Sequence, residues 1–143
     1  MKTWLAIAAA AAVGVGVSAA EKRVQMKDLP AAVQAAVQKE LAGATLKGLA
    51  REIEGGKTMY EAETLKNGKT RDLLFDAKGA LIEVEEEIAL ADAPQAVQAA
   101  LAARGKILRV ETVTKGTAVS YEAVVEKNGK KSEVVVGADG KGR

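Results

Sequence analysis

Residues 60–69 read YEAETLKNGK, and residues 121–130 read YEAVVEKNGK. Both stretches begin with Tyr-Glu-Ala and end with Lys-Asn-Gly-Lys, and they stand 61 residues apart. Apolar and charged residues largely alternate up to an Asn-Gly pair, which tolerates the two positive φ angles of a type I′ turn. The sequence therefore predicts the same β-hairpin twice.

A second repeated motif lies upstream of each hairpin. Residues 30–37 read PAAVQAAV and residues 94–101 read PQAVQAAL, with an offset of 64 instead of 61. Their apolar residues recur at helical spacing, and a leading Pro costs no hydrogen bond, so each motif predicts a helix. Asp28 and Asp92 stand just before the prolines, where a carboxylate favours a helix N-terminus. The second copy has lost three residues, most simply between its helix and its first strand.

Further turn signals complete the order of elements. Gly55-Gly56 and Lys115-Gly116 precede the repeated strands, and residues 82–88 give the first copy a fourth strand that the second copy lacks. The predicted fold class is α+β, in the order α-β-β-β-β-α-β-β-β, built as two tandem helix-plus-antiparallel-sheet units. We assign the first unit to residues 21–90 and the shortened second unit to residues 91–143. The helices pack on one sheet face, and the other face is wet.

Residues 1–20 have the three-part pattern of a secretory signal peptide. Met1-Lys2 is a positive start, residues 4–17 are uncharged and apolar, and Val17-Ser18-Ala19-Ala20 offers small residues to a signal peptidase. The apolar run rises only about 21 Å as a helix, short of the ~30 Å hydrocarbon core. We therefore expect cleavage after Ala20 (or Ala19), export to a periplasm or the medium, and no stable membrane anchor afterwards.

The composition argues against catalysis. The sequence has no Cys and no His, so thiolate nucleophiles, Cys-ligated metals, the commonest general base and the commonest transition-metal ligand are missing. Beyond residue 20 the serines are Ser120 and Ser132, and neither lies in a glycine-rich elbow. The net charge is +2, and basic and acidic residues alternate along the chain, so the sequence does not indicate a nucleic-acid-binding surface. We predict no catalytic, cofactor-binding or metal-binding residues, and no nucleic-acid partner.

The densest charge run is Glu83, Glu85, Glu86 and Glu87. On a strand, Glu83, Glu85 and Glu87 share one face. This face could hold a hard cation such as calcium or meet a basic partner. The other interpretation is a solvated strand face beside Lys or Arg of a neighbouring strand. In contrast, Asp76-Ala77-Lys78-Gly79 lacks the alternating oxygen ligands of a calcium loop, so it predicts an ordinary turn.

Strand alternation divides the hairpin residues between two sheet faces. Tyr60, Ala62, Leu73 and Phe75 are expected on the helix side, where they should matter for stability. The opposite face is a possible partner-binding face, and its predicted residues are Glu61, Glu63, Leu65, Leu74, Glu122, Val124 and Val135. Leu74 and Val135 are apolar and stand 61 residues apart. They are either incidentally exposed or the centre of an interface with a charged rim.

The repeated elements resemble those of the PepSY and PepSY-like domains. The similarity rests on the Pro-led helix, the Tyr-Glu-Ala strand, the Asn-Gly-Lys hairpin and the Phe-Asp-Ala-Lys-Gly turn, and it covers nearly all of residues 24–142 in two units. The second unit departs from the pattern at Val136 and Gly137. The resemblance implies a fold related to that of beta-lactamase inhibitor proteins, which present a concave sheet face to an enzyme. It also implies an exported bacterial protein that restrains a peptidase, and it supplies no catalytic residue.

Three hypotheses follow from these patterns. The leading one is an exported, non-catalytic binding or inhibitory module that presents a sheet face to a protein partner such as a peptidase. The alternative is an envelope ligand- or cation-binding protein that uses the acidic strand Glu83–Glu87. A hydrolase that works with carboxylates alone is the third.

Overall fold

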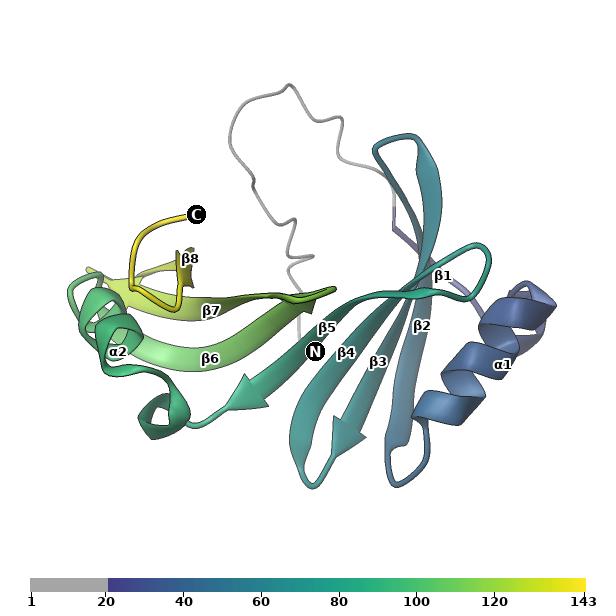
Figure 1. The fold of residues 1–143 in the computed structure, drawn as a ribbon, viewed down its shortest axis with the longest axis horizontal. Helices are drawn as coiled ribbons and strands as arrows, with labels where there is room; N and C mark the ends of the chain where they lie inside the picture. The colour runs from purple at the N-terminus through teal and green to yellow at the C-terminus, as the bar shows by residue number, and fades with distance from the viewer. Residues whose placement is uncertain (1–20) are drawn as a thin grey trace.

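The computed structural model describes residues 21–143, so the predicted signal peptide lies outside the described residues. The chain forms an α+β fold with one eight-stranded antiparallel sheet and two α-helices, as shown in Figure 1. The first half contains β1 (Lys22–Arg23), a 3₁₀ turn (Met26–Asp28), α1 (Ala31–Glu40), β2 (Thr45–Glu54), β3 (Lys57–Lys66), β4 (Lys69–Asp76) and β5 (Leu81–Ile88). The second half contains a 3₁₀ turn (Leu90–Asp92), α2 (Gln95–Ala102), β6 (Lys106–Lys115), β7 (Ala118–Lys127) and β8 (Lys130–Gly137).

The sheet runs without a break through both halves of the chain. Its strands are ordered from β1 to β8 as they occur in the sequence, and β5 pairs with β6 from Glu83↔Lys115 to Ile88↔Val110. Figure 1 shows that the sheet is curved, with α1 and α2 against its outer side at opposite ends. One face of the sheet is thus packed against helices, and the opposite face is common to both halves.

The two halves repeat each other strand by strand. The strands β2, β3 and β4 start 61 residues before β6, β7 and β8, and a β-bulge recurs at Leu46/Gly48 and Ile107/Arg109. The predicted loss of three residues is found mostly in the helix itself. α1 has 10 residues and α2 has 8, and the connection to the next strand is one residue shorter in the second half.

The Asn-Gly hairpins have the predicted turn. Asn67 and Asn128 both have φ of 53°, and Gly68 and Gly129 follow with φ of 76° and 73°. Two successive positive φ angles define the type I′ turn, whose twist matches that of the two flanking strands. These two local signals therefore set the register of β3 with β4 and of β7 with β8.

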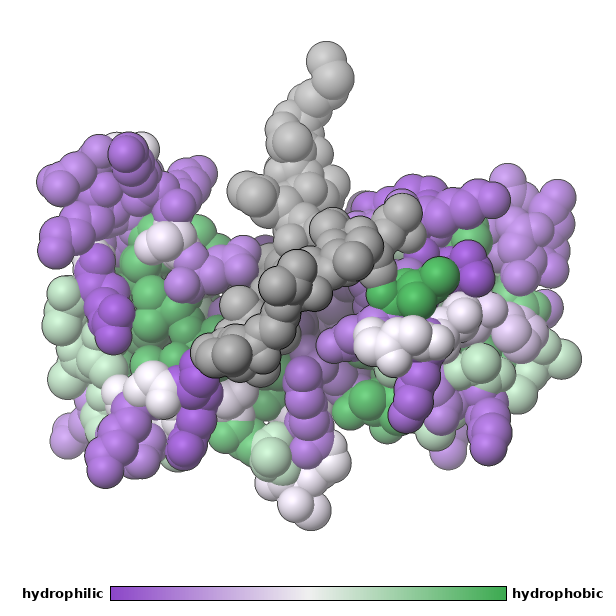
Figure 2. Space-filling model, turned by 90° about the horizontal axis from the view of Figure 1, so that it is seen from above, coloured by the Kyte–Doolittle hydropathy of each residue, from purple (hydrophilic) through white to green (hydrophobic). Residues whose placement is uncertain are grey.

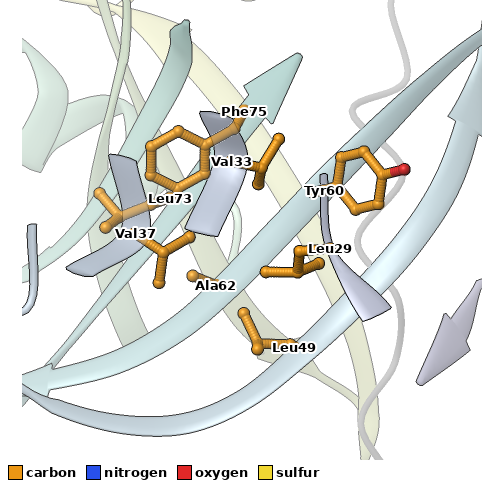
Figure 3. Close-up of a cluster of buried hydrophobic side chains, with 8 residues drawn as sticks. All are labelled: Leu29, Val33, Val37, Leu49, Tyr60, Ala62, Leu73 and Phe75. Atoms are coloured by element: carbon orange, nitrogen blue, oxygen red, sulfur yellow. The ribbon is translucent and has the colours of Figure 1, made fainter. Parts of the chain in front are cut away.

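Each half has its own hydrophobic core between a helix and the sheet. In the first half, shown in Figure 3, the buried residues are Leu29, Val33, Val37, Leu49, Tyr60, Ala62, Leu73 and Phe75. In the second half they are Ala93, Val97, Leu101, Val110, Ala123, Val125 and Val136. All four residues expected on the helix side are therefore in the core. The two cores share no residue, so the sheet is what connects them.

The segments before the helices differ from the prediction. Pro30, and not an acidic residue, is the N-cap of α1, and it makes no side-chain cap. The Asp28 carboxylate instead accepts a hydrogen bond from the Gln25 N–H at 3.0 Å, within the 3₁₀ turn. In each helix, a glutamine in the first turn donates a hydrogen bond to a backbone carbonyl that precedes the helix. Gln34 Nε2 donates to the Leu29 carbonyl at 2.9 Å, and Gln98 Nε2 donates to the Ala93 carbonyl at 2.8 Å.

The turn after β4 packs against α1. Asp76 Oδ1 accepts hydrogen bonds from the Lys78 and Ala80 N–H groups, both at 2.9 Å, which confirms the predicted turn chemistry. Gly79 has φ of 83°, and a Cβ at this position would stand 2.5 Å from the Ala32 carbonyl oxygen. Gly140 stands in the same relation to Ala96 of α2. Both helices therefore approach the sheet at a turn that needs glycine.

Candidate functional site

The candidate site is the sheet face opposite α1 and α2, which we call the inner face. Residues that pair directly across antiparallel strands lie on the same face. Because Ala62 pairs with Leu73 in the core, its neighbours Glu61 and Glu63 must point to the other side. The register places all seven predicted partner-binding residues on this inner face: Glu61, Glu63, Leu65, Leu74, Glu122, Val124 and Val135.

Carboxylates dominate the inner face. The register brings together acidic residues from β2 through β8, which are Glu52, Glu61, Glu63, Asp72, Glu83, Glu85, Glu87, Glu111, Glu122 and Glu133. The predicted hairpin glutamates and the predicted acidic strand are thus parts of one surface. Glu86, in contrast, is on the outer side, where its carboxylate lies 2.9 Å from Arg71 Nε.

Among residues 21–143, three basic side chains contact these carboxylates. Lys115 Nζ lies 2.8 Å from Glu83 Oε2, Arg23 Nη1 lies 2.7 Å from Glu63 Oε1, and Arg109 Nη2 lies 3.3 Å from Glu111 Oε1. The expectation that the acidic strand lies beside Lys or Arg of a neighbouring strand is therefore met at Glu83. Basic residues remain fewer than acidic ones on the face.

The crowding and burial of these groups change their acidity. Burial, with repulsion from Asp72 and Glu52, raises the pKa of Glu61 to about 8. Burial, with repulsion from Glu133 and Glu111, raises the pKa of Glu122 to about 7. Burial and the neighbouring Glu83 also raise the pKa of Glu85. The face thus holds carboxyls in surroundings that disfavour their charge.

Glu122 is a deeply buried carboxyl on this face, and one of its oxygens has no partner. It lies on β7 between Glu111 of β6 and Val135 of β8, and 4% of its surface is exposed. Within residues 21–143, its Oε1 atom is buried and has no hydrogen-bond partner. A buried polar atom without a partner is costly, and such atoms are rare in folded proteins.

Apolar side chains lie among the carboxylates. Leu74 is half-buried between its cross-strand neighbours Glu61 and Glu83, and Val135 is half-buried beside Glu122. Figure 2 looks down on this side of the molecule and shows hydrophilic margins with smaller apolar patches between them. The inner face therefore combines an acidic surround with apolar residues at two equivalent positions.

The acidic strand alone does not assemble a cation site. In the described part of the chain, the carboxylates that bring three oxygens within 4.8 Å of one another are Glu21, Glu61 and Glu63. Glu83 is already paired with Lys115, and Glu87 accepts a hydrogen bond from Thr70 Oγ1 at 3.2 Å.

No helix of residues 21–143 is long and apolar enough to span a bilayer.

The comparison with known proteins rests on solved structures. No family model matches the chain, and no curated protein matches it. A candidate periplasmic protein of Bacteroides eggerthii has a TM-score of 0.65 at 22% identity, over 80% of this chain and 85% of that one. A protein of Bacteroides ovatus described as a DUF2874 family protein has a TM-score of 0.61 at 19% identity, over 80% and 84%. A BLIP-like protein of Bacteroides fragilis has a TM-score of 0.57 at 22% identity, over 78% and 81%.

These likenesses bear on the architecture. Each covers about four fifths of both chains, so the likeness extends beyond a single hairpin and beyond one half of the chain. The chain therefore has the BLIP-like α+β fold that its repeated helix and hairpin motifs predicted.

Proposed function

We propose that this protein is an exported, non-catalytic binding module of PepSY-like type, which presents its inner face to a protein partner outside the cytoplasm. The observation that carries the proposal is the inner face itself. Neither α1 nor α2 packs on it, and apolar side chains lie there among many carboxylates. The signal-peptide pattern of residues 1–20 supports export.

The acidic residues of the inner face favour a role in binding over a role in folding. The raised pKa values of Glu61 and Glu122 mean that their charged forms are less stable in the folded protein than in water. Groups perturbed in this way are concentrated at functional sites. A partner that carries positive charge would stabilise them.

The apolar residues supply the rest of an interface. Leu74 and Val135 are flanked by Glu61, Glu83 and Glu122 across the strands. Interfaces commonly have an apolar centre, depleted in charge, within a polar rim. Each proposed unit, residues 21–90 and residues 91–143, contributes one such apolar residue to the shared face.

The partner class follows from the resemblance and the fold. A PepSY-like module of BLIP-like fold would bind an envelope enzyme, such as a peptidase, and inhibit it. The similar structure from Bacteroides eggerthii, a candidate periplasmic protein, agrees with a location in the periplasm. This part of the proposal names a class of enzyme and no individual protein.

Metal binding is the less supported alternative. Within the trio of Glu21, Glu61 and Glu63, Arg23 already pairs with Glu63 at 2.7 Å and lies 3.8 Å from Glu21. Calcium needs about six to eight oxygen ligands, whereas the inner face spreads its carboxylates over many strands. The wide spacing suits a protein surface better than a single ion.

Partner capture tests the proposal. The purified protein is immobilised and exposed to an envelope extract of its own organism, and the captured proteins are identified by mass spectrometry and then tested as purified partners. The double variant Leu74→Arg/Val135→Arg should lose the partner. It should keep its melting temperature, because the new arginines stand beside Glu61, Glu83 and Glu122.

The matched control is Val119→Arg, an apolar-to-arginine change on the outer side of β7, where Val119 is 47% exposed. This variant should bind the purified partner as the wild type does. Equal binding by the double variant would exclude the inner face as the partner surface. Export is tested by N-terminal sequencing: a product that begins at Glu21 or Ala20 supports it, and intact Met1 in a membrane fraction contradicts it.

A further inference from the structure

The partnerless oxygen of Glu122 is the most specific feature of the inner face. The residue is 96% buried, since 4% of its surface is exposed, yet no donor within residues 21–143 reaches its Oε1. Leaving a buried carboxylate oxygen without a donor costs more than an average hydrogen bond contributes. A ligand that brings a hydrogen-bond donor to this atom would remove that cost.

The charged groups around Glu122 favour a cationic ligand. Glu111 stands directly across on β6, and Glu133 lies on β8 two residues from Val135, the cross-strand partner of Glu122. Arg109 acts on Glu122 as a positive charge, but its guanidinium is engaged with Glu111 at 3.3 Å. Glu111 also accepts a hydrogen bond from Thr70 Oγ1 at 3.4 Å. Two further carboxylates and one guanidinium therefore lie around Glu122, whose buried Oε1 has no donor within residues 21–143.

Apolar side chains lie on other sides of Glu122. Val135 is its cross-strand neighbour on β8, and Val124 lies two residues further along the same face of β7. Val113 of β6 pairs with Ser120, which lies two residues before Glu122 on β7. Val124 and Val135 are half-buried. Arginine and lysine side chains bury their methylene stems along such surfaces while their charged ends reach polar groups.

We propose that Glu122 anchors a subsite on the inner face for one arginine or lysine side chain of the partner protein, with Val124 and Val135 against its stem. The inference rests on the proposed function, because it assigns the chemistry of the partner at that face. Glu122 accepts the hydrogen bonds of the guanidinium or ammonium group, and Glu111 and Glu133 add long-range attraction.

A metal ion fits this subsite poorly. Calcium would need about six to eight oxygens, but Val124 and Val135 occupy two of the positions beside Glu122. Glu111 is already bound by Arg109 and Thr70. A single charge at the end of an apolar stem matches both the carboxylate and its surroundings.

The test uses a short probe peptide with one cation, acetyl-Gly-Gly-Arg-Gly-Gly-amide, and its neutral citrulline analogue. Binding to the purified protein is followed by the NMR signal of the Glu122 carboxyl carbon in the wild type, and by the methyl signals of Val124 and Val135 in the wild type and in every variant. The arginine peptide should shift these signals in a saturable way, and the citrulline peptide should not. Glu122→Gln should weaken binding about ten-fold or more, because one charge-assisted hydrogen bond is lost.

Glu86→Gln is the matched control, since it removes one charge from the opposite side of the same sheet. It should keep binding within about two-fold of the wild type. Equal binding by wild type and Glu122→Gln, or equal weakening by Glu86→Gln, would overturn the subsite. A Glu122 signal that calcium shifts and the arginine peptide does not would overturn it in favour of a metal site.

Different experimental results would contradict the subsite and the proposed function. If Leu74→Arg/Val135→Arg abolishes capture of the purified partner while Glu122→Gln binds it normally, the subsite is wrong and the inner face still acts. If neither change affects capture, the proposed function itself is wrong. Glu122→Gln is nearly isosteric, and an unchanged or raised melting temperature separates loss of binding from loss of the fold.

Discussion

Lowering the pH from about 8 to about 6 should stabilise the folded protein, because several inner-face carboxyls have raised pKa values. Burial, with repulsion from other acidic residues, raises the pKa of Glu61 to about 8 and that of Glu122 to about 7. In the unfolded chain a glutamate titrates near ~4.3. Between these values the folded state binds more protons than the unfolded state. The free energy of unfolding therefore rises as the pH falls towards the unfolded pKa.

The free energy of unfolding changes by about 1.4 kcal/mol per pH unit for each carboxyl that is protonated in the folded protein and charged in the unfolded chain. Over this interval Glu61 would contribute about 2 kcal/mol and Glu122 about 1 kcal/mol on that basis. Water screens part of the Glu61 contribution, because this side chain is half-buried. We therefore expect these two groups to raise the free energy of unfolding by about 2 kcal/mol, and Glu85, whose pKa is also raised, to add to the increase.

Urea denaturation followed by circular dichroism at the two pH values measures this increase, with the m-value expected to stay constant. The double variant Glu61→Gln/Glu122→Gln should be more stable than the wild type at the higher pH and should lose the part of the pH dependence that these two groups contribute. Glu86→Gln, on the outer side beside Arg71, should keep the dependence. A free energy of unfolding that is equal at both pH values, or lower at about pH 6, would refute the reasoning.

Three predictions concern the packing of the fold, and urea denaturation checks each of them. Gly68→Val and Gly129→Val should each lower the free energy of unfolding by about 1–3 kcal/mol, because a β-branched residue is strained at positive φ; wild-type stability in both would contradict the type I′ turns. Gly79→Ala should be more harmful than Gly68→Ala, because its Cβ would meet the Ala32 carbonyl of α1, whereas nothing lies within 4 Å of Gly68; equal losses would mean that the turn does not pack on the helix. Phe75→Ala should cost about 3–5 kcal/mol, since Phe75 is 1% exposed in the core; a loss as small as that of a surface change would place it outside the core.

Local signals in the sequence were sufficient for most of the fold. The Asn-Gly pairs and the alternation around Tyr60 predicted two hairpins, because turn type and side-chain period act within a few residues. The same alternation assigned Glu61, Leu74 and Val135 to the face without helices, as observed. The pairing of β5 with β6 could not be predicted in this way, since it joins strands that are separated by a helix.

Two inner-face residues escaped prediction for a specific reason. The bulge at Ile107/Arg109 shifts the register of β6 by one residue. Simple alternation would put Ile107 on the same face as Arg109 and Glu111, but the bulge leaves Ile107 with the core and turns the other two inward. A bulge has no strong sequence signal, so the ion pair of Arg109 with Glu111 was visible only in the structure.

The separation of the two cores has a mechanical consequence. Each helix packs on its own end of the sheet. The two buried clusters have no residue in common. β5 lies between the two cores, because Val84 packs against the first cluster and Ile88 against the second. A change in the curvature of the sheet along β5 would therefore reshape the inner face while each helix kept its own core.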